Sequence, residues 1–113
     1  MVKVLVVDDD EGMRNSYELL FRAVDYECIC AEDGNEGLAK ALEHNPDLII
    51  SDRNMPNMNG YEMALRLRGD EGTKPIPLIG IGDFQEFEKY LFNQTYLKGN
   101  VSVLKVIQPF LEK

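Results

Sequence analysis

The sequence is informative first through what it lacks. It has no tryptophan, one histidine and two cysteines, and its 12 Lys and Arg face 20 Asp and Glu, which gives a net charge of −8. Because phosphates are neutralised by clustered basic side chains, this charge argues against nucleic acid as a direct ligand and against an anionic membrane surface. No apolar run reaches the roughly 18 residues of a membrane span, and the first residues do not read as a signal peptide.

The cysteines and the histidine do not form a recognisable metal motif. Cys28 and Cys30 stand two apart in a strand-like stretch, so their side chains point the same way and a disulfide between them is strained. The histidine, His44, lies in a helical stretch away from this pair. We therefore predict reduced thiols without a bound metal, in a protein of the cytoplasm.

What is present is enough for one hydrophobic core. Apolar residues make up 44% of the chain and charged residues 28%. A chain of this size buries about 65% of its unfolded surface, so we predict a single domain over residues 1–113. Most of the acidic residues then form a solvated coat, unless some of them converge on a site.

The chain alternates between strand-like and helix-like segments. Segments rich in apolar and β-branched residues predict strands at residues 2–7, 27–31, 47–51 and 75–81, with a weaker one at 96–98. The first and third of these show no alternation, which is typical of strands buried on both faces. Apolar residues at helical spacing predict helices at 13–24, 37–42, 61–68, 84–91 and 103–111, the fourth of them short. This pattern predicts a doubly wound α/β fold, in which five parallel strands carry helices on both faces.

Charged residues follow several of these strands directly. Asp8 to Asp10 come after the first strand and Asp52 after the third, with Asp83 after the fourth and Lys98 near the fifth. Ligands of such sheets bind beyond the carboxyl ends of the strands. Gathered carboxylates repel one another unless a cation neutralises them, and Mg²⁺ suits oxygen ligands of this kind. A carboxylate beside Mg²⁺ and a lysine can act as a nucleophile toward phosphorus.

Each of these residues also has a plainer explanation. The run Asp8 to Asp10 could cap the amides of the following helix, and Asp52 could be a turn residue before Asn54 and Pro56. Lys98, taken alone, is typical of a solvated surface lysine. The joint placement of the acids after the first and third strands favours a site.

Two segments of the chain resemble the receiver domain of bacterial two-component response regulators. One is Val4-Leu5-Val6-Val7-Asp8-Asp9-Asp10, and the other runs from Pro46 to Gly60 and contains Asp52-Arg53-Asn54-Met55-Pro56. The second segment is especially similar to chemotaxis-type single-domain receivers. The resemblance covers essentially the whole chain and implies a flavodoxin-like, three-layer fold.

The resemblance also implies a function. Asp52 would accept a phosphoryl group from a sensor histidine kinase or a phosphotransfer protein. Mg²⁺ would be held by Asp9, Asp52 and the backbone carbonyl of Asn54, with Asp8 helping through water, and Lys98 is the candidate for the family's pocket lysine. The implied output is a switched surface that binds a downstream protein or an output domain. Such a receiver is a signalling module, so we expect no enzyme activity.

Four features depart from the family pattern. Gly82 stands where the family carries a Ser or Thr whose hydroxyl bonds the phosphoryl oxygen. Asp83 either faces the pocket, where it repels a phosphoryl group, or caps the next helix. The fourth helical region is shortened, and Lys98 is followed by Gly99 rather than by proline. Depending on register, Lys98 or Gly99 takes the lysine position, and we expect Lys98 to reach the pocket.

Three functions are therefore weighed. The first is a phosphorylatable receiver, and the second is a degenerate receiver that docks proteins without phosphorylation. The third is a hydrolase with Asp52 as nucleophile, which needs a general acid–base and a substrate pocket that the sequence does not show.

Overall fold

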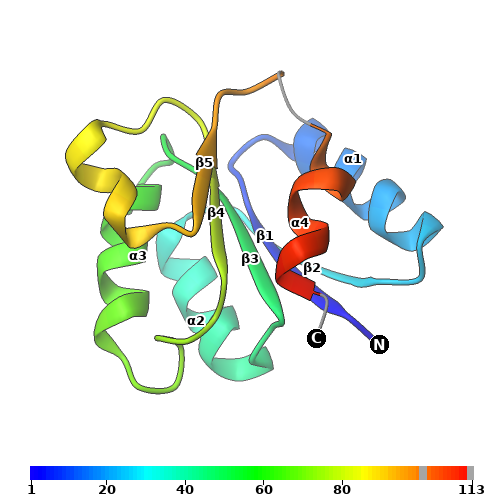
Figure 1. Ribbon diagram of the computed structural model, residues 1–113, viewed down its shortest axis with the longest axis horizontal. Helices are drawn as coiled ribbons and strands as arrows, with labels where there is room; N and C mark the ends of the chain where they lie inside the picture. The colour runs from blue at the N-terminus through cyan, green and yellow to red at the C-terminus, as the bar shows by residue number, and fades with distance from the viewer. Residues whose placement is uncertain (100–101, 112–113) are drawn as a thin grey trace.

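Ten strands and helices alternate along the chain in the computed structural model, which describes residues 1–99 and 102–111 (Figure 1). The strands are β1 (Lys3–Val7), β2 (Glu27–Ala31), β3 (Leu48–Asp52), β4 (Leu78–Ile81) and β5 (Gln94–Tyr96). The helices are α1 (Glu11–Ala23), α2 (Gly34–His44), α3 (Gly60–Gly69), the 3₁₀ helix η1 (Glu86–Leu91) and α4 (Val103–Leu111). The order of strand and helix is the one that the sequence predicts.

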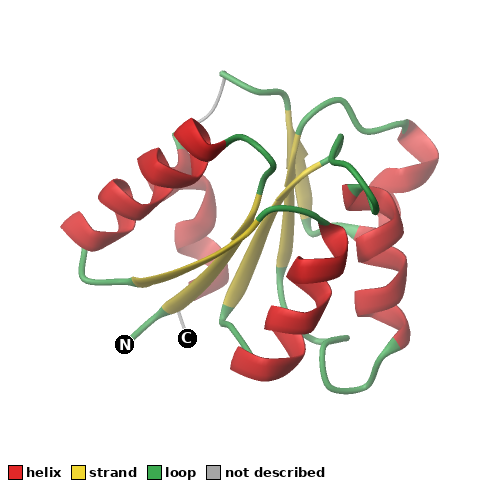
Figure 2. Ribbon diagram, turned by 180° about the vertical axis from the view of Figure 1, so that it is seen from behind, coloured by secondary structure: helices red, strands yellow, loops and turns green. Residues whose placement is uncertain are grey.

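The five strands form one sheet in the order β2-β1-β3-β4-β5, and every neighbouring pair is parallel. Helices cover both of its faces (Figure 2). The doubly wound, flavodoxin-like fold predicted from the sequence is therefore confirmed. The chain leaves β1 toward β2 and returns on the other side of β1 with β3, so the strand order reverses between β1 and β3. Ligand sites of such folds lie at this reversal, beyond the carboxyl ends of the strands.

One hydrophobic cluster lies on each face of the sheet. The helices α1 and α4 supply Phe21 and Ile107 to a cluster that includes Ile50 of β3, and all three are buried. On the other face, Met63 of α3 joins a cluster with Ile49, the preceding residue of β3. Successive residues of β3 thus enter opposite cores, which explains why the central strands are apolar without alternation.

The starts of the helices are fixed by short polar side chains. Asp10 accepts hydrogen bonds from the backbone N–H groups of Gly12 and Met13 at 2.8 and 3.4 Å, and so caps α1. Asn59 and Glu62 form a reciprocal capping box at the start of α3. Of the acidic run after β1, Asp10 therefore has the plainer role of a helix cap.

The strand β5 lies two residues earlier than the predicted 96–98. It pairs Thr95 with Gly80 of β4, and the chain then turns near Gly99, whose φ is 83°. The prediction is wrong because β5 is an edge strand, which tolerates polar residues such as Gln94 and Thr95 that a search for apolar runs passes over.

The fourth helical segment is short and irregular, as the sequence predicts. It forms only the six-residue 3₁₀ helix η1. Helices of this kind have poor hydrogen-bond geometry and depend on side-chain contacts for their stability. Within residues 1–99 and 102–111, no helix is long and apolar enough to cross a membrane.

The contact between α3 and β3 provides a test of the fold. A Cβ on Gly60 would collide with the backbone carbonyl of Asp52, whereas nothing lies within 4 Å of a Cβ on Gly69 at the other end of α3. We expect Gly60→Ala to lower the free energy of unfolding by about 1–3 kcal/mol, the usual cost of overpacking. Gly69→Ala should leave it unchanged or raise it by up to about 1 kcal/mol. Urea denaturation measures both, and equal effects would contradict the packing described here.

Candidate functional site

Three carboxylates meet at the carboxyl ends of β1 and β3. The register of these parallel strands places Val7 beside Ser51, so the residues that follow, Asp8 and Asp52, are neighbours. Asp8, Asp9 and Asp52 each offer an oxygen atom, and these three oxygens lie within 4.8 Å of one another. The structure thus brings together the three acids that the sequence analysis singled out.

Two of the three carboxylates are buried. Asp8 is 4% exposed and Asp52 is 6% exposed, whereas Asp9 is exposed. Burial raises the pKa of Asp8, and the charges of Asp52 and Asp9 raise it further, against a backbone hydrogen bond from Asp10 that lowers it. Because the cluster confines negative charge in a poorly solvated place, it is suited to a cation.

Lys98 supplies one positive charge to this cluster. Its Nζ donates to Oδ2 of Asp52 at 3.0 Å, while half of its own side chain remains exposed. The hydrogen bond to Asp52 raises the pKa of Lys98, and the charges of Asp52, Asp8 and Asp9 add to this effect. The structure therefore puts Lys98, and not Gly99, at the acidic cluster.

The other oxygen of Asp52 is held by the backbone. The N–H of Arg53 donates to Oδ1 of Asp52 at 2.7 Å. The backbone amide and the Lys98 ammonium together fix the orientation of the carboxylate from both sides. Orientation of this kind is what a nucleophilic carboxylate needs, since little rotation then precedes attack.

An open cavity of about 660 Å³ lies over the cluster. Its walls include Asp9, Asp52 and Lys98, together with Asn54 from the loop after β3. Asp83 is exposed and also lines this cavity, and the residue that caps η1 is Gln85. Of the two alternatives for Asp83, the helix cap is therefore wrong, because the chain continues two residues further before η1 begins.

Gly82 stands close to the Asp52 carboxylate and has an unusual backbone. Its φ is 156°, a conformation that side-chain-bearing residues rarely adopt. A Cβ at this position would lie 3.2 Å from Oδ1 of Asp52 and 3.3 Å from the Cβ of Arg53. The site therefore has no hydroxyl at residue 82, and the space for one is partly taken by its neighbours.

An ion pair that the sequence does not predict lies beside the site. The Arg53 guanidinium donates from Nε and Nη2 to the two carboxylate oxygens of Glu88, at 2.9 and 2.6 Å. Glu88 belongs to η1 and is 1% exposed, and the hydrogen bonds from Arg53 hold its pKa below the usual range. A signal was available, since Glu88 shares a helical face with the apolar Phe84 and Leu91, and an acid on such a face needs a partner.

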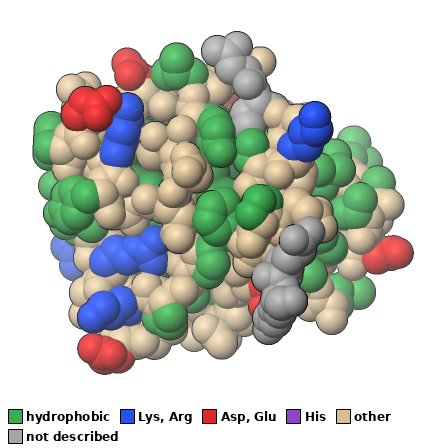
Figure 3. All heavy atoms as spheres, in the orientation of Figure 1, with side chains coloured by type: hydrophobic (Ala, Val, Ile, Leu, Met, Phe, Trp, Pro, Cys, Tyr) green, Lys and Arg blue, Asp and Glu red, His purple; other side chains and the backbone are tan. Residues whose placement is uncertain are grey.

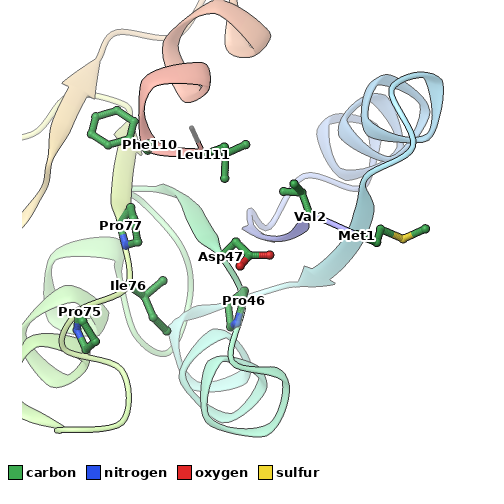
Figure 4. Close-up of a pocket in the computed structure, with 9 residues that line it drawn as sticks. All are labelled: Met1, Val2, Pro46, Asp47, Pro75, Ile76, Pro77, Phe110 and Leu111. Carbon is green, nitrogen blue, oxygen red and sulfur yellow. The ribbon is translucent and has the colours of Figure 1, made fainter. Parts of the chain in front are cut away.

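A second cavity, of about 580 Å³, opens at the other end of the sheet (Figure 4). Apolar and proline side chains line it, and its one carboxylate, Asp47, is labelled among them in Figure 4. Asp47 already accepts a hydrogen bond from the backbone N–H of Lys3 at 2.8 Å. Because this cavity lies at the amino ends of the strands and gathers no reactive groups, we place the functional site at the acidic cluster.

The two cysteines lie together on β2. Their Sγ atoms are 3.9 Å apart, and both thiols are free and half-buried. The prediction that the two side chains point the same way is confirmed. Cys30 also donates to Glu18 of α1 at 3.3 Å.

The fold agrees with comparisons to known proteins. The sequence matches the response regulator receiver domain family over residues 4–105. It is 37% identical to the alkaline phosphatase synthesis transcriptional regulatory protein PhoP of Bacillus subtilis over 89 residues, which cover 79% of this chain and 37% of PhoP. The chain thus spans only about a third of this relative and of the phosphate regulon regulator PhoB of Pseudomonas aeruginosa, of which 33% is matched.

Solved structures give the same result over nearly the whole chain. The chemotaxis response regulator CheY4 of Vibrio cholerae is 32% identical with a TM-score of 0.87, over 98% of this chain and 99% of that one. The response regulator TrrA of Thermotoga maritima, solved with Mg²⁺ and BeF, is 28% identical with a TM-score of 0.87, over 98% and 100%. In complex with the histidine kinase ThkA, TrrA is matched at 25% identity and a TM-score of 0.86, over 99% and 100%. With its parallel five-stranded sheet and the three acids at the ends of β1 and β3, this chain belongs to the response regulator receiver domain family.

Proposed function

We propose that this chain is a phosphorylatable receiver, which accepts a phosphoryl group on Asp52 from the phosphohistidine of a sensor kinase or a phosphotransfer protein. The observation that carries the proposal is the geometry at Asp52. Its carboxylate is 6% exposed, lies beside two further acids, and is held by the Lys98 ammonium at 3.0 Å. Residues 1–113 are proposed to act as one receiver domain, whose target is a protein partner or an output domain.

The donor atoms at the site fit Mg²⁺. Asp8, Asp9 and Asp52 offer only carboxylate oxygens, the ligands that a hard divalent cation prefers. Asp9 and Asp52 would hold the ion with the backbone carbonyl of Asn54, and Asp8 would take part through water. When bound, the ion neutralises the acidic cluster and the charge on a transferring phosphoryl group. The relative TrrA, which was solved with Mg²⁺ and BeF, supports this assignment.

The transfer itself requires little from the protein beyond orientation and charge. A carboxylate oxygen of Asp52 attacks the phosphorus of the phosphohistidine, so that a P–O bond forms and the P–N bond breaks. The electron pair of that bond returns to the imidazole nitrogen, and the imidazole leaves neutral when its other nitrogen is protonated. Asp52 reacts in its ionised form and needs no base. Lys98 is placed to pair with the phosphoryl oxygens, because its ammonium already lies at the same carboxylate.

Two observations favour a second candidate, the degenerate receiver that docks proteins without phosphorylation. Gly82 offers no hydroxyl to a phosphoryl oxygen, and Asp83 adds a negative charge to the wall of the cavity. Both reduce the stabilisation of a phosphoryl group relative to the usual family site. We favour phosphorylation because the nucleophile, the lysine and the acidic cluster are all assembled in one place.

A small phosphodonor distinguishes the two candidates. We expect incubation with Mg²⁺ and acetyl phosphate to raise the mass of the wild-type protein by one phosphoryl group, and chelation of Mg²⁺ to prevent this. Asp52→Asn should remove the labelling, because the amide is not a nucleophile, whereas Asp83→Asn should retain it. Mass spectrometry of the intact protein measures all four samples. An unmodified wild-type protein would favour the degenerate receiver.

Lys98 offers a test with opposite effects on two readouts. Lys98→Gln removes the positive charge beside Asp52, so we expect Mg²⁺ to bind severalfold more tightly to the less neutralised cluster. The same variant should label more slowly with acetyl phosphate, since the developing phosphoryl charge loses a partner. Calorimetric titration with Mg²⁺ and the labelling time course measure the two effects. The control is Lys89→Gln, whose lysine pairs with Glu86 on the surface of η1 and should change neither.

A further inference from the structure

The ion pair between Arg53 and Glu88 connects the candidate phosphoacceptor to η1. Arg53 directly follows Asp52, and its backbone N–H already donates to Oδ1 of Asp52 at 2.7 Å. Its side chain ends on Glu88, 35 residues later in the chain, with two hydrogen bonds of 2.9 and 2.6 Å. One residue therefore touches both the reacting carboxylate and the helix beyond it.

Glu88 depends on this contact, and η1 depends on Glu88. The carboxylate is 1% exposed, and besides the guanidinium it accepts the backbone N–H of Gln85 at 2.8 Å, at the start of η1. A buried carboxylate that loses its counter-charge is strongly destabilised where it stands. If the guanidinium leaves, Glu88 has to move toward water, and the start of η1 moves with it.

The guanidinium is also close to the cavity over Asp52. Its Nη1 donates to Oδ1 of Asn54 at 3.0 Å, and Asn54 lines that cavity. A Cβ on Gly82 would lie 3.3 Å from the Cβ of Arg53, so the glycine leaves room beside the arginine stem. A side chain at residue 82 would therefore lie against the Arg53 side chain and hinder its movement toward Asp52.

Gly82 has no hydroxyl that could couple a phosphoryl group on Asp52 to the surface of the domain. We propose that Arg53 takes this role instead: a phosphoryl group on Asp52 draws the guanidinium away from Glu88, and η1 is released. The proposal rests on phosphorylation of Asp52. A phosphoryl group carries nearly two negative charges and three acceptor oxygens, so it competes well with a single carboxylate for a bidentate arginine. No covalent bond changes in this step, and the arginine only rotates about its own side chain.

Release of η1 changes an apolar part of the surface. Phe87 and Tyr90 of η1 are 65% and 72% exposed, and Phe87 contacts Tyr61 of α3 edge-on with ring centroids 5.7 Å apart. Figure 3 shows hydrophobic side chains among charged ones on the side of the molecule that carries η1 and β5. A shift of η1 alters how these rings are presented, which gives a partner two different surfaces to distinguish.

The test uses beryllofluoride with Mg²⁺ as the probe, added to the full chain and followed by ¹⁵N NMR. In the wild-type protein we expect shifts of the amides around Asp52, of the Arg53 Nε–H signal and of the amides of η1. In Glu88→Gln and in Arg53→Gln the amides around Asp52 should still respond. The response of η1 should be lost in both, because the ion pair that holds it is already absent.

The matched control is Lys89→Gln, which removes the exposed ion pair to Glu86 on the same helix and should keep the full wild-type response. Pocket amides that shift while the Arg53 Nε–H and η1 signals stay fixed would overturn the coupling and leave the proposed phosphorylation intact. No shift of any wild-type signal would overturn both. If a glutamine variant does not fold, the wild-type Arg53 Nε–H signal decides, with Arg53→Lys expected to give a weaker η1 response because lysine lacks the bidentate fork.

Discussion

The parallel pairing of β1 with β3 brings the carboxylates of Asp8 and Asp52 together, and the other contacts of the site offset the repulsion between them. The hydrogen-bonded register fixes Asp8 beside Asp52, and the two cores on either side of the sheet leave both carboxylates largely shielded from water. Strand pairing and apolar burial stabilise this arrangement, while the mutual repulsion of the acids opposes it. The fold therefore maintains a place where a cation or a positively charged side chain would relieve the electrostatic repulsion between the acids.

Two basic residues border this charge, and they are used differently. Lys98 comes from the turn after β5 and binds Asp52 directly, whereas the guanidinium of Arg53 is turned away to Glu88 although its backbone holds the same carboxylate. The structure thus keeps one positive charge engaged at the acids and a second one nearby on another partner. Gly82 borders this arrangement, since a Cβ there would lie 3.2 Å from Oδ1 of Asp52 and 3.3 Å from the Cβ of Arg53.

The sequence predicts the features that follow from apolar periodicity or from a general rule of the fold, and it fails where neither applies. The order of strands and helices, the short fourth helix and the gathering of Asp8, Asp9 and Asp52 follow from apolar periodicity and from the rule that strand ends share an edge. The position of β5 could not be obtained in this way, because an edge strand carries little apolar signal. The Arg53–Glu88 pair was also missed, since a contact between residues 35 positions apart depends on tertiary packing.

The brevity of η1 has a consequence for how the molecule fluctuates. A six-residue 3₁₀ helix has few hydrogen bonds of its own, so side-chain contacts at its two ends set the free energy of its local opening. That free energy can be small while the sheet and the longer helices stay closed. Substitutions at the exposed positions Phe87 and Tyr90 can then change the balance between the open and closed forms of η1 while the sheet and the longer helices keep their own contacts.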